Sequence, residues 1–170
     1  AAPGLKVNAF AKDLKHPRWM EVLPNGDVAV AEARFEPGGP ATSIFDFAMQ
    51  STMRRAAALG DSPNRITLLR DRDGDGVADE RFLFLEKQWQ PFGMALVGDT
   101  FYVGNTDALL TFDYKDAATK LEGPTAKLMD FKPGGHWTRS LLLSPDNTKL
   151  YAGVGSLSNI GDDGMEAEQG

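Results

Sequence analysis

The sequence contains no cysteine, and its only two histidines are His16 and His136. The absence of cysteine excludes disulfide bonds, CxxC redox centres, cysteine nucleophiles and cysteine-based zinc sites. Two histidines are too few for a histidine-rich metal centre. No run of about 18 apolar residues occurs, so we expect no membrane span. The net charge of −6 and the lack of a basic run argue against nucleic-acid binding through the phosphates.

Glycine and proline are abundant, with 18 and 10 residues in a chain of 170. This composition favours short elements and tight turns over long helices.

The chain opens with Ala-Ala-Pro-Gly and has no initiator methionine. Removal of a signal peptide would leave such a start, and so would artificial shortening of the chain. From the first alternative we expect a periplasmic or secreted protein.

Three segments of the chain resemble one another. Each has a polar or aromatic opening residue, a short apolar strand, a turn and a second apolar strand, and the segments are 16–32, 90–105 and 136–155. The turns lie at 24–27, 98–99 and 145–147, where residue pairs such as Asn-Gly and Pro-Asp favour tight hairpins. The second and third openers, Gln90 and His136, are 46 positions apart, which is close to the length of one β-propeller blade. Further strands are expected at 64–70, 81–85, 109–114 and 126–131.

This pattern predicts an all-β fold, a β-propeller of which about three blades are present. Residues 1–170 would form the N-terminal part of a single propeller domain, with a helical insertion at about 36–62. Because propellers usually close with about four to eight blades, we expect the chain to be a piece of a longer protein, or its remaining blades to lie on another chain.

The insertion contains a predicted helix at 42–59, which begins at Thr42 or Ser43 as a cap. Its apolar positions include several methionines. We expect this face to pack on the sheet, and a lid or a membrane-surface helix are the alternatives.

The loop 71–79 is rich in aspartate. Asp71, Asp73 and Asp75 match the first half of an EF-hand calcium loop, and Asp79 falls at its ninth position. The twelfth position should be a bidentate glutamate and is Phe82. Two interpretations remain open: a solvated hairpin turn, or a weak structural Ca²⁺ site with Asp71, Asp73, Asp75 and Asp79 as ligands.

His136 is the candidate catalytic residue. It opens a repeat behind two glycines, and a neutral imidazole there could take a proton from a hydroxyl, although a packed or loop histidine would fit the same pattern. Arg139 could bind an anion. Gln90 and Arg18 open the other repeats, so we expect these openers to converge on one axis, where Arg18, Gln90 and Arg139 could bind a cofactor.

Motifs along nearly the whole chain resemble the L-sorbosone dehydrogenase branch of the glucose/sorbosone dehydrogenases. The similarity is carried by the runs HPRWM, LPNGDV, NRITLLRDRDGDG, QPFGMAL, GHWTR, SPD and LYAGVGSLSN, which begin at residues 16, 23, 64, 90, 135, 144 and 150. The resemblance implies an exported, six-bladed propeller that binds pyrroloquinoline quinone (PQQ), supported by Ca²⁺. It also implies oxidation of a sugar, sugar aldehyde or related alcohol, and an external electron acceptor.

The resemblance also implies roles for single residues. His136 matches the family's general base, and Gln90 resembles a glutamine that contacts the quinone. Ser156 and Asn159 fall in a stretch with polar side chains close to the quinone and substrate, although soluble glucose dehydrogenases often have aspartate where Ser156 stands. The arginines and lysine that bind the quinone carboxylates, and the backbone ligands of its calcium, would lie in later blades.

Two other functions remain open. A lactonase-type propeller would hold a catalytic Ca²⁺ on its axis, and Glu32 or Asn105 could serve as ligands. A non-catalytic binding propeller would share the fold but lack an axial base, and His136 argues against it.

Overall fold

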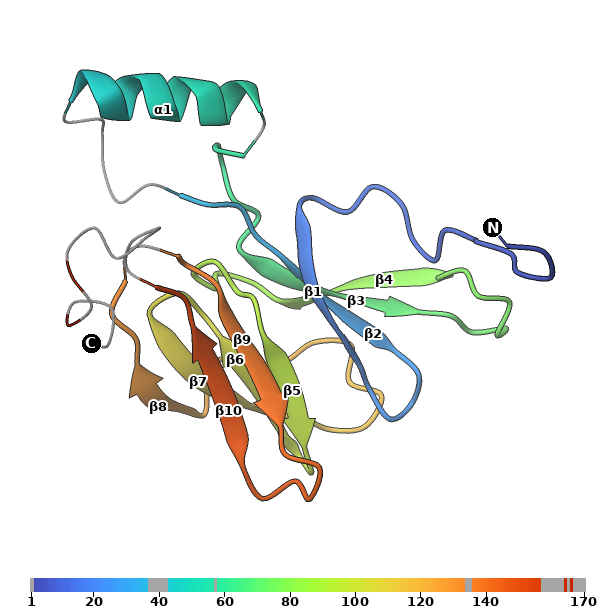
Figure 1. Cartoon of the computed structure of the whole chain (residues 1–170). Coiled ribbons are helices and arrows are strands. Elements are labelled where there is room, and N and C mark those ends of the chain that lie inside the picture. The colour runs from blue at the N-terminus through green and yellow to red at the C-terminus, as the bar shows by residue number, and fades with distance from the viewer. Residues whose placement is uncertain are drawn as a thin grey trace.

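The computed structural model describes residues 2–36, 43–56, 58–133, 136–156, 164 and 166. Their strands form three antiparallel sheets, which follow one another along the chain (Figure 1). Sheet 1 contains β1 (Pro17–Val22), β2 (Val28–Glu32), β3 (Arg65–Arg70) and β4 (Glu80–Leu85). Sheet 2 contains β5 (Met94–Val97), β6 (Thr100–Gly104), β7 (Ala108–Asp113) and β8 (Ala126–Asp130). Sheet 3 contains β9 (Arg139–Leu143) and β10 (Leu150–Val154).

The three similar segments of the sequence are the first hairpins of the three sheets. The pairs β1–β2, β5–β6 and β9–β10 are each antiparallel, as the turn residues predicted. Two of the turns require a left-handed backbone, with φ +88° at Gly26 and φ +56° at Asn147. Glycine and asparagine adopt this conformation at little cost, so the turn chemistry sets where each hairpin reverses.

The main core lies between sheets 1 and 2. Alternate residues of each strand point into it, because side chains on a strand alternate between the two faces. Phe84 and Phe101 meet edge to face, with ring centroids 5.5 Å apart. The buried apolar residues of this core are Leu23, Ala29, Ala31, Ile66, Leu68, Phe84, Leu85, Met94, Phe101, Val103, Phe112, Tyr114 and Leu121.

A smaller core joins sheet 2 to sheet 3, with Ala95, Leu109, Phe131 and Leu141 buried in it. The first strands of the sheets adjoin, because β1 contacts β5 and β5 contacts β9. Their N-terminal ends therefore lie at the same end of the molecule, which we name the opener end (Figure 1).

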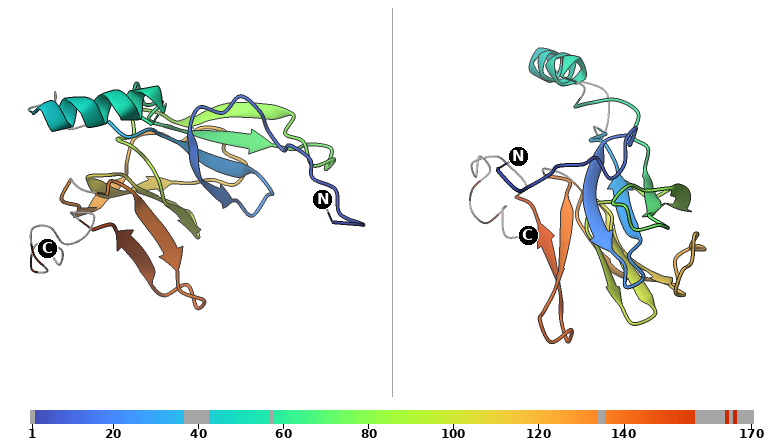
Figure 2. Two further views of the ribbon diagram at one scale, coloured as in Figure 1. Left: turned by 45° about the horizontal axis from the view of Figure 1, so that its top comes forward. Right: turned by 90° about the vertical axis from the view of Figure 1, so that its right-hand side faces the viewer.

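Helix α1 (Ile44–Arg55) confirms the predicted helix, with narrower bounds. Ser43 is its N-cap, and the Ser43 side chain accepts a hydrogen bond from the Asp46 amide. The expected packing on a sheet was wrong, since no helix residue is buried and Phe45 is 70% exposed. The reason is topological: the insertion leaves β2 and returns to β3 at the opener end, so α1 lies beyond the sheets (Figure 2).

These observations confirm an all-β architecture with one inserted helix. Two sheets have four strands and the third has two, and within the described residues the sheets do not close into a ring. The described part of the chain contains no helix with the length and apolar character needed to cross a membrane.

Candidate functional site at the opener end

Three aromatic rings line up across the starts of the sheets. The ring centroids of Trp19 and Phe92 are 5.3 Å apart, and those of Phe92 and Trp137 are 6.1 Å apart. The guanidinium carbon of Arg18 lies 5.2 Å from the centroid of the Trp137 ring, a cation–π distance. The row therefore connects the residues beside all three openers, and it brings Arg18 next to the residue that follows His136.

The geometry of His136 supports a role as a base. Its imidazole is exposed, and its Nδ1 and its backbone amide lie 3.0 and 3.1 Å from the carbonyl oxygen of Ser156. A carbonyl can only accept, so Nδ1 carries the proton in the neutral ring. Nε2 then keeps its lone pair and can accept a proton from a bound molecule.

Gly155 makes this arrangement sterically possible. A Cβ atom on Gly155 would lie 2.5 Å from the Cβ of His136, which is closer than two carbon atoms can approach. Ser156 stands just beyond β10, whose last residue Val154 pairs with Arg139 at the start of β9. The β9–β10 pairing thus brings the two segments together.

Gln90 lies at the opener end, but its side chain is buried and engaged within the protein. Its Oε1 accepts a hydrogen bond from the Thr106 hydroxyl at 2.9 Å, and its Nε2 donates to the Glu36 carbonyl at 3.4 Å. The same hydroxyl lies 3.1 Å from the carbonyl of Trp137. In this structure the Gln90 side chain is therefore engaged by Thr106 and Glu36, and it does not present its amide to solvent.

Sequence reasoning missed Thr106. No motif marks this residue, because its two partners are 16 and 31 positions away in the chain. Its burial, with 3% exposure, follows from the contact between sheets 2 and 3, which the sequence does not record.

The two arginines predicted to bind the cofactor differ in accessibility. Arg18 is exposed, and its Nε donates to the carbonyl of Ala33 at 3.0 Å. Arg139 is 1% exposed, and its guanidinium donates to backbone carbonyls. Of the other predicted contacts, Ser156 lies beside His136, whereas Asn159 lies outside the described residues.

A hollow of about 480 Å³ adjoins the aromatic row on the β1 side. It is lined by Leu14, Pro17, Arg18, Trp19 and Met20. The combination of an apolar floor with one exposed guanidinium suits a flat molecule that carries negative charge.

The aspartate-rich loop is the connection between β3 and β4, as the hairpin interpretation predicted. The carboxylate oxygens of Asp71, Asp73 and Asp79 lie within 4.8 Å of one another, whereas Asp75 is not part of this group. Amide hydrogen bonds from Gly76 and Gly74 lower the pKa of Asp71. The carboxylates thus order the loop's own backbone, and calcium binding here stays a prediction.

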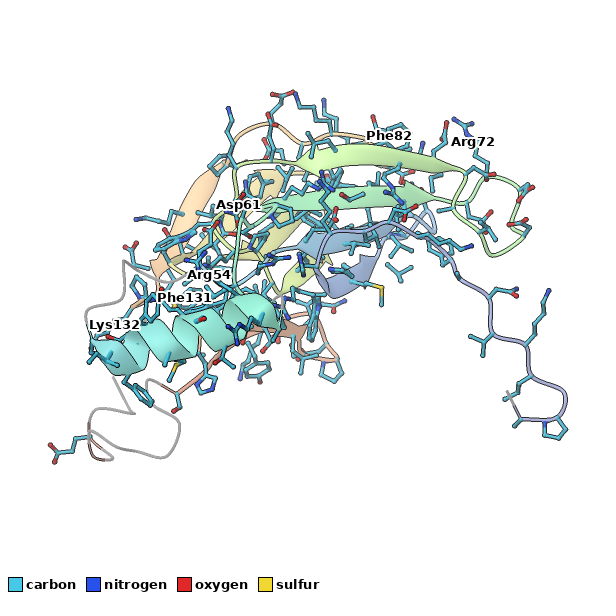
Figure 3. All side chains as sticks on the ribbon, turned by 90° about the horizontal axis from the view of Figure 1, so that it is seen from above. Arg54, Asp61, Arg72, Phe82, Phe131 and Lys132 are labelled. Carbon is cyan, nitrogen blue, oxygen red and sulfur yellow. The ribbon has the colours of Figure 1, made fainter. Side chains whose placement is uncertain are left out.

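This loop is remote from the opener end. β3 starts at the opener end and runs away from it, so a loop after Arg70 lies at the far end of sheet 1 (Figure 1). Figure 3 shows Arg72 and Phe82 on this hairpin. A cation held there would order the hairpin and could not touch a molecule bound beside His136.

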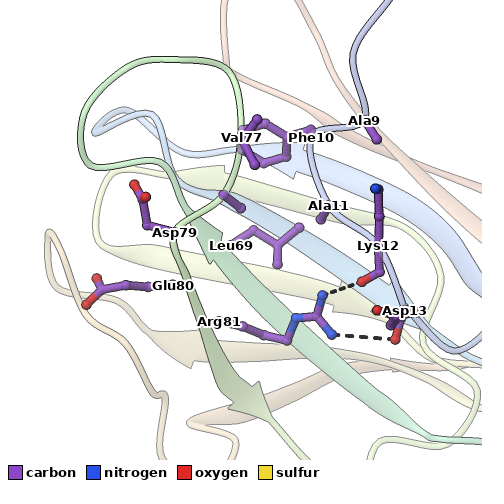
Figure 4. Close-up of a pocket in the computed structure, with 11 residues that line it drawn as sticks. Ala9, Phe10, Ala11, Lys12, Asp13, Leu69, Val77, Asp79, Glu80 and Arg81 are labelled. Atoms are coloured by element: carbon purple, nitrogen blue, oxygen red, sulfur yellow. Dashed lines mark hydrogen bonds between the residues drawn. The ribbon is translucent and has the colours of Figure 1, made fainter.

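A second cavity, of about 400 Å³, also lies at the far end, between the N-terminal segment and the β3–β4 hairpin (Figure 4). Its walls include Phe10, Leu69 and Val77. Arg81 closes one side, where its guanidinium donates to the carbonyls of Lys12 and Asp13. These contacts tie the N-terminal segment to sheet 1.

Glu32, a candidate calcium ligand in the lactonase alternative, is completely buried. Arg65 donates to both of its oxygens, at 2.9 and 3.2 Å, and the Thr67 hydroxyl and the Lys15 amide donate as well. Burial alone would raise the pKa of Glu32, but these hydrogen bonds lower it below its usual value. The carboxylate therefore stabilises sheet 1, and both of its oxygens are occupied by protein donors instead of being available to a metal ion.

The chain shares its fold with two solved structures, one of which is a PQQ domain. The holo form of the pyranose dehydrogenase PQQ domain from Coprinopsis cinerea aligns with a TM-score of 0.64 and 16% identity, over 91% of this chain and 31% of that one. An iodide structure of a Trichoderma reesei carbohydrate-active enzyme of family AA12 aligns with a TM-score of 0.66 and 17% identity, over 93% and 34%.

At these identities the likeness shows the fold alone. The chain spans about a third of the length of either protein. No protein-family model matches the sequence, and no curated protein matches it.

Proposed function

We propose that this chain is part of a PQQ-dependent dehydrogenase that oxidises a sugar, a sugar aldehyde or a related alcohol, with His136 as the general base. The observation that carries the proposal is the hydrogen bond between His136 Nδ1 and the Ser156 carbonyl, which leaves Nε2 as an exposed acceptor. The shared fold with a holo PQQ domain supports it.

The opener end fits PQQ in two respects. PQQ is flat and carries carboxylates, and the exposed Arg18 beside the aromatic row offers both charge and a stacking surface. When bound, the quinone would supply the hydride acceptor that amino-acid side chains lack. Gln90 and Arg139 are buried, so we assign them support of the site and not direct contact with PQQ.

Within this site, His136 would take the proton of the substrate hydroxyl. The Ser156 carbonyl accepts the hydrogen bond from Nδ1–H throughout, so it keeps the ring oriented and stabilises the imidazolium that forms. The hydroxyl proton therefore moves to Nε2 while the substrate carbon is oxidised. An external electron acceptor would then be needed to return the cofactor to its oxidised state.

We further propose that the longer protein closes a propeller. Sheets 1 and 2 each have four strands and sheet 3 has two, which leaves β10 with an unpaired edge in the described residues. Two added strands would complete sheet 3, and further sheets would pack on the outer faces of sheets 1 and 3.

The test is the rate of quinone reduction in the full-length, PQQ-loaded protein, measured by rapid mixing with substrate. His136→Gln should lower this rate by about 10²–10⁴-fold, because the hydroxyl proton loses its acceptor.

The matched control is His16→Gln, which changes the other histidine of this chain and should leave the rate close to that of the unmodified protein. A His136→Gln variant that folds, binds PQQ and is reduced at the original rate would overturn the assignment of the base.

A further inference from the structure

The guanidinium of Arg139 is buried without a carboxylate partner. The side chain is 1% exposed, and none of the ion pairs among the described residues includes it. A buried charge must recover the hydrogen bonds that it gives up to water. The two terminal nitrogens of Arg139 do so with three backbone carbonyls, those of His136 at 2.7 Å, Lys132 at 3.0 Å and Thr138 at 3.1 Å, whereas Nε has no partner among the described residues.

These three carbonyls all belong to the segment that carries His136. The planar guanidinium directs its donors along fixed lines, so the carbonyls must converge on it to be bonded. The ring of Phe131 packs against the same cation, with its centroid 5.5 Å from the guanidinium carbon. The cation thus constrains the backbone on both sides of His136 in the sequence.

The backbone of Arg139 is itself held in place by sheet 2. Its carbonyl accepts a hydrogen bond from the Gly93 amide at 2.9 Å. A Cβ atom on Gly93 would lie 2.6 Å from that carbonyl oxygen, and one on Gly104 would lie 2.7 Å from it. Only glycines permit so close an approach, so the position of Arg139 is fixed relative to the start of β5.

We infer that Arg139 is a positioning residue, which sets the orientation of the His136 imidazole through the backbone of the segment. His136 is held from two sides, because Arg139 binds its carbonyl while Ser156 accepts from its amide and from Nδ1. This inference rests on the proposed function for the importance of His136, but its structural part can be tested without activity.

The first readout is the tautomer of His136, measured by ¹⁵N NMR on histidine-labelled full-length protein without quinone and assigned with His136→Gln. The unmodified protein should show Nδ1 protonated and Nε2 unprotonated. In Arg139→Lys, a single ammonium cannot reach all three carbonyls, so both tautomers should be populated and exchange of the His136 amide should be faster.

The second readout is the rate of quinone reduction in the PQQ-loaded protein. Arg139→Lys should lower the maximal rate by about tenfold to a hundredfold, with little change in KM, because a misplaced base affects the proton transfer more than binding. The matched control is Arg81→Lys, which also replaces a guanidinium bonded to backbone carbonyls, but at the far end of sheet 1. It should change neither readout.

If Arg139→Lys does not fold, Phe131→Leu decides the question. It keeps an apolar side chain while removing the ring against the guanidinium, and it should shift the tautomer in the same direction by a smaller amount. A folded Arg139→Lys or Phe131→Leu protein with unchanged tautomer and amide exchange overturns the inference. If His136→Gln proves fully active, the proposed function fails while the tautomer result still decides the role of Arg139.

Discussion

The two histidines show how much the chemistry of a residue depends on its neighbours. His136 has one ring nitrogen bonded to a carbonyl and the other available to a ligand. His16 instead receives a hydrogen bond from Arg34 on its Nε2, and burial together with the charges of Arg34 and Arg18 lowers its pKa. The same side chain is therefore a candidate base at one position and a structural acceptor at the other.

Glu32 leads to a prediction about acid stability. Its pKa is lowered by folding, so the charged carboxylate stabilises the native state above pH 4.5, and this contribution is lost as the pH falls through the lowered pKa. Glu32→Gln should cost about 1–3 kcal/mol of unfolding free energy at pH 7. The difference between the two proteins should shrink in strong acid, as chemical denaturation at several pH values would measure.

Glu80→Gln is the control, since Glu80 forms an ion pair with Arg72 at the surface and its loss should matter much less. A Glu32→Gln protein as stable as the unmodified one at pH 7 would show that the buried carboxylate contributes nothing.

The aspartate-rich loop should bind calcium weakly or not at all. Phe82 replaces the bidentate ligand of an EF-hand, and Glu80 is engaged by Arg72. Calorimetry should therefore detect no sub-micromolar site. Sub-micromolar binding that is abolished by Asp73→Ala would contradict this prediction.

At the scale of the elements, the close packing of sheet 3 against sheet 2 depends on Gly93. The Gly93 amide bonds the Arg139 carbonyl, and a Cβ atom on Gly93 would also lie 2.3 Å from the Leu141 amide nitrogen. The atoms that the added Cβ would meet belong to the backbone of sheet 3, which cannot change rotamer as a side chain can. The two sheets would therefore have to move apart.

Gly93→Ala should consequently destabilise the protein by about 1–3 kcal/mol, measured by denaturant unfolding. Gly123→Ala is the matched control, because no atom lies within 4 Å of its added Cβ and its backbone is not left-handed. Equal stability of the two variants would mean that the backbones of Gly93 and sheet 3 are not in close contact.

Considered as a whole molecule, the chain leaves apolar side chains on its two outermost sheets. Met20 and Val22 on β1 are 67% and 68% exposed, and Leu142 on β9 and Tyr151 on β10 are 69% and 54% exposed. Between these sheets the facing surfaces are buried in the two cores. Since the chain spans about a third of its structural neighbours, we expect further sheets to cover these faces.

The substitution Leu142→Glu tests this expectation in chains of two lengths. In the 170-residue chain it should change the unfolding free energy by less than about 0.5 kcal/mol, because the side chain is exposed. In the full-length protein it should cost about 3 kcal/mol or more, because it would place a carboxylate in an apolar interface. The same small effect in both chains would show that no further sheet covers β9.

The sequence by itself determined the local structure. Turn residues such as Asn25 and Gly26, with apolar strands on either side, predicted the hairpins, and the apolar pattern after Ser43 predicted the helix. These features depend on interactions between residues close in the chain, so they can be read without the fold. The resemblance to PQQ-dependent sugar dehydrogenases, also drawn from the sequence, agrees with the fold of the structural neighbours.

Only the tertiary structure decided which of the predicted site residues are accessible to solvent and which are buried. Gln90 and Arg139 are buried in it, and no residue of α1 is buried against a sheet. His136 Nδ1 is hydrogen-bonded to the carbonyl of a residue 20 positions away. Burial and hydrogen-bond partners depend on how sheets meet, and the residues that meet are distant in the sequence. For that reason the sequence could name His136, whereas its tautomer and the groups that hold it followed from the packing of sheet 3 on sheet 2.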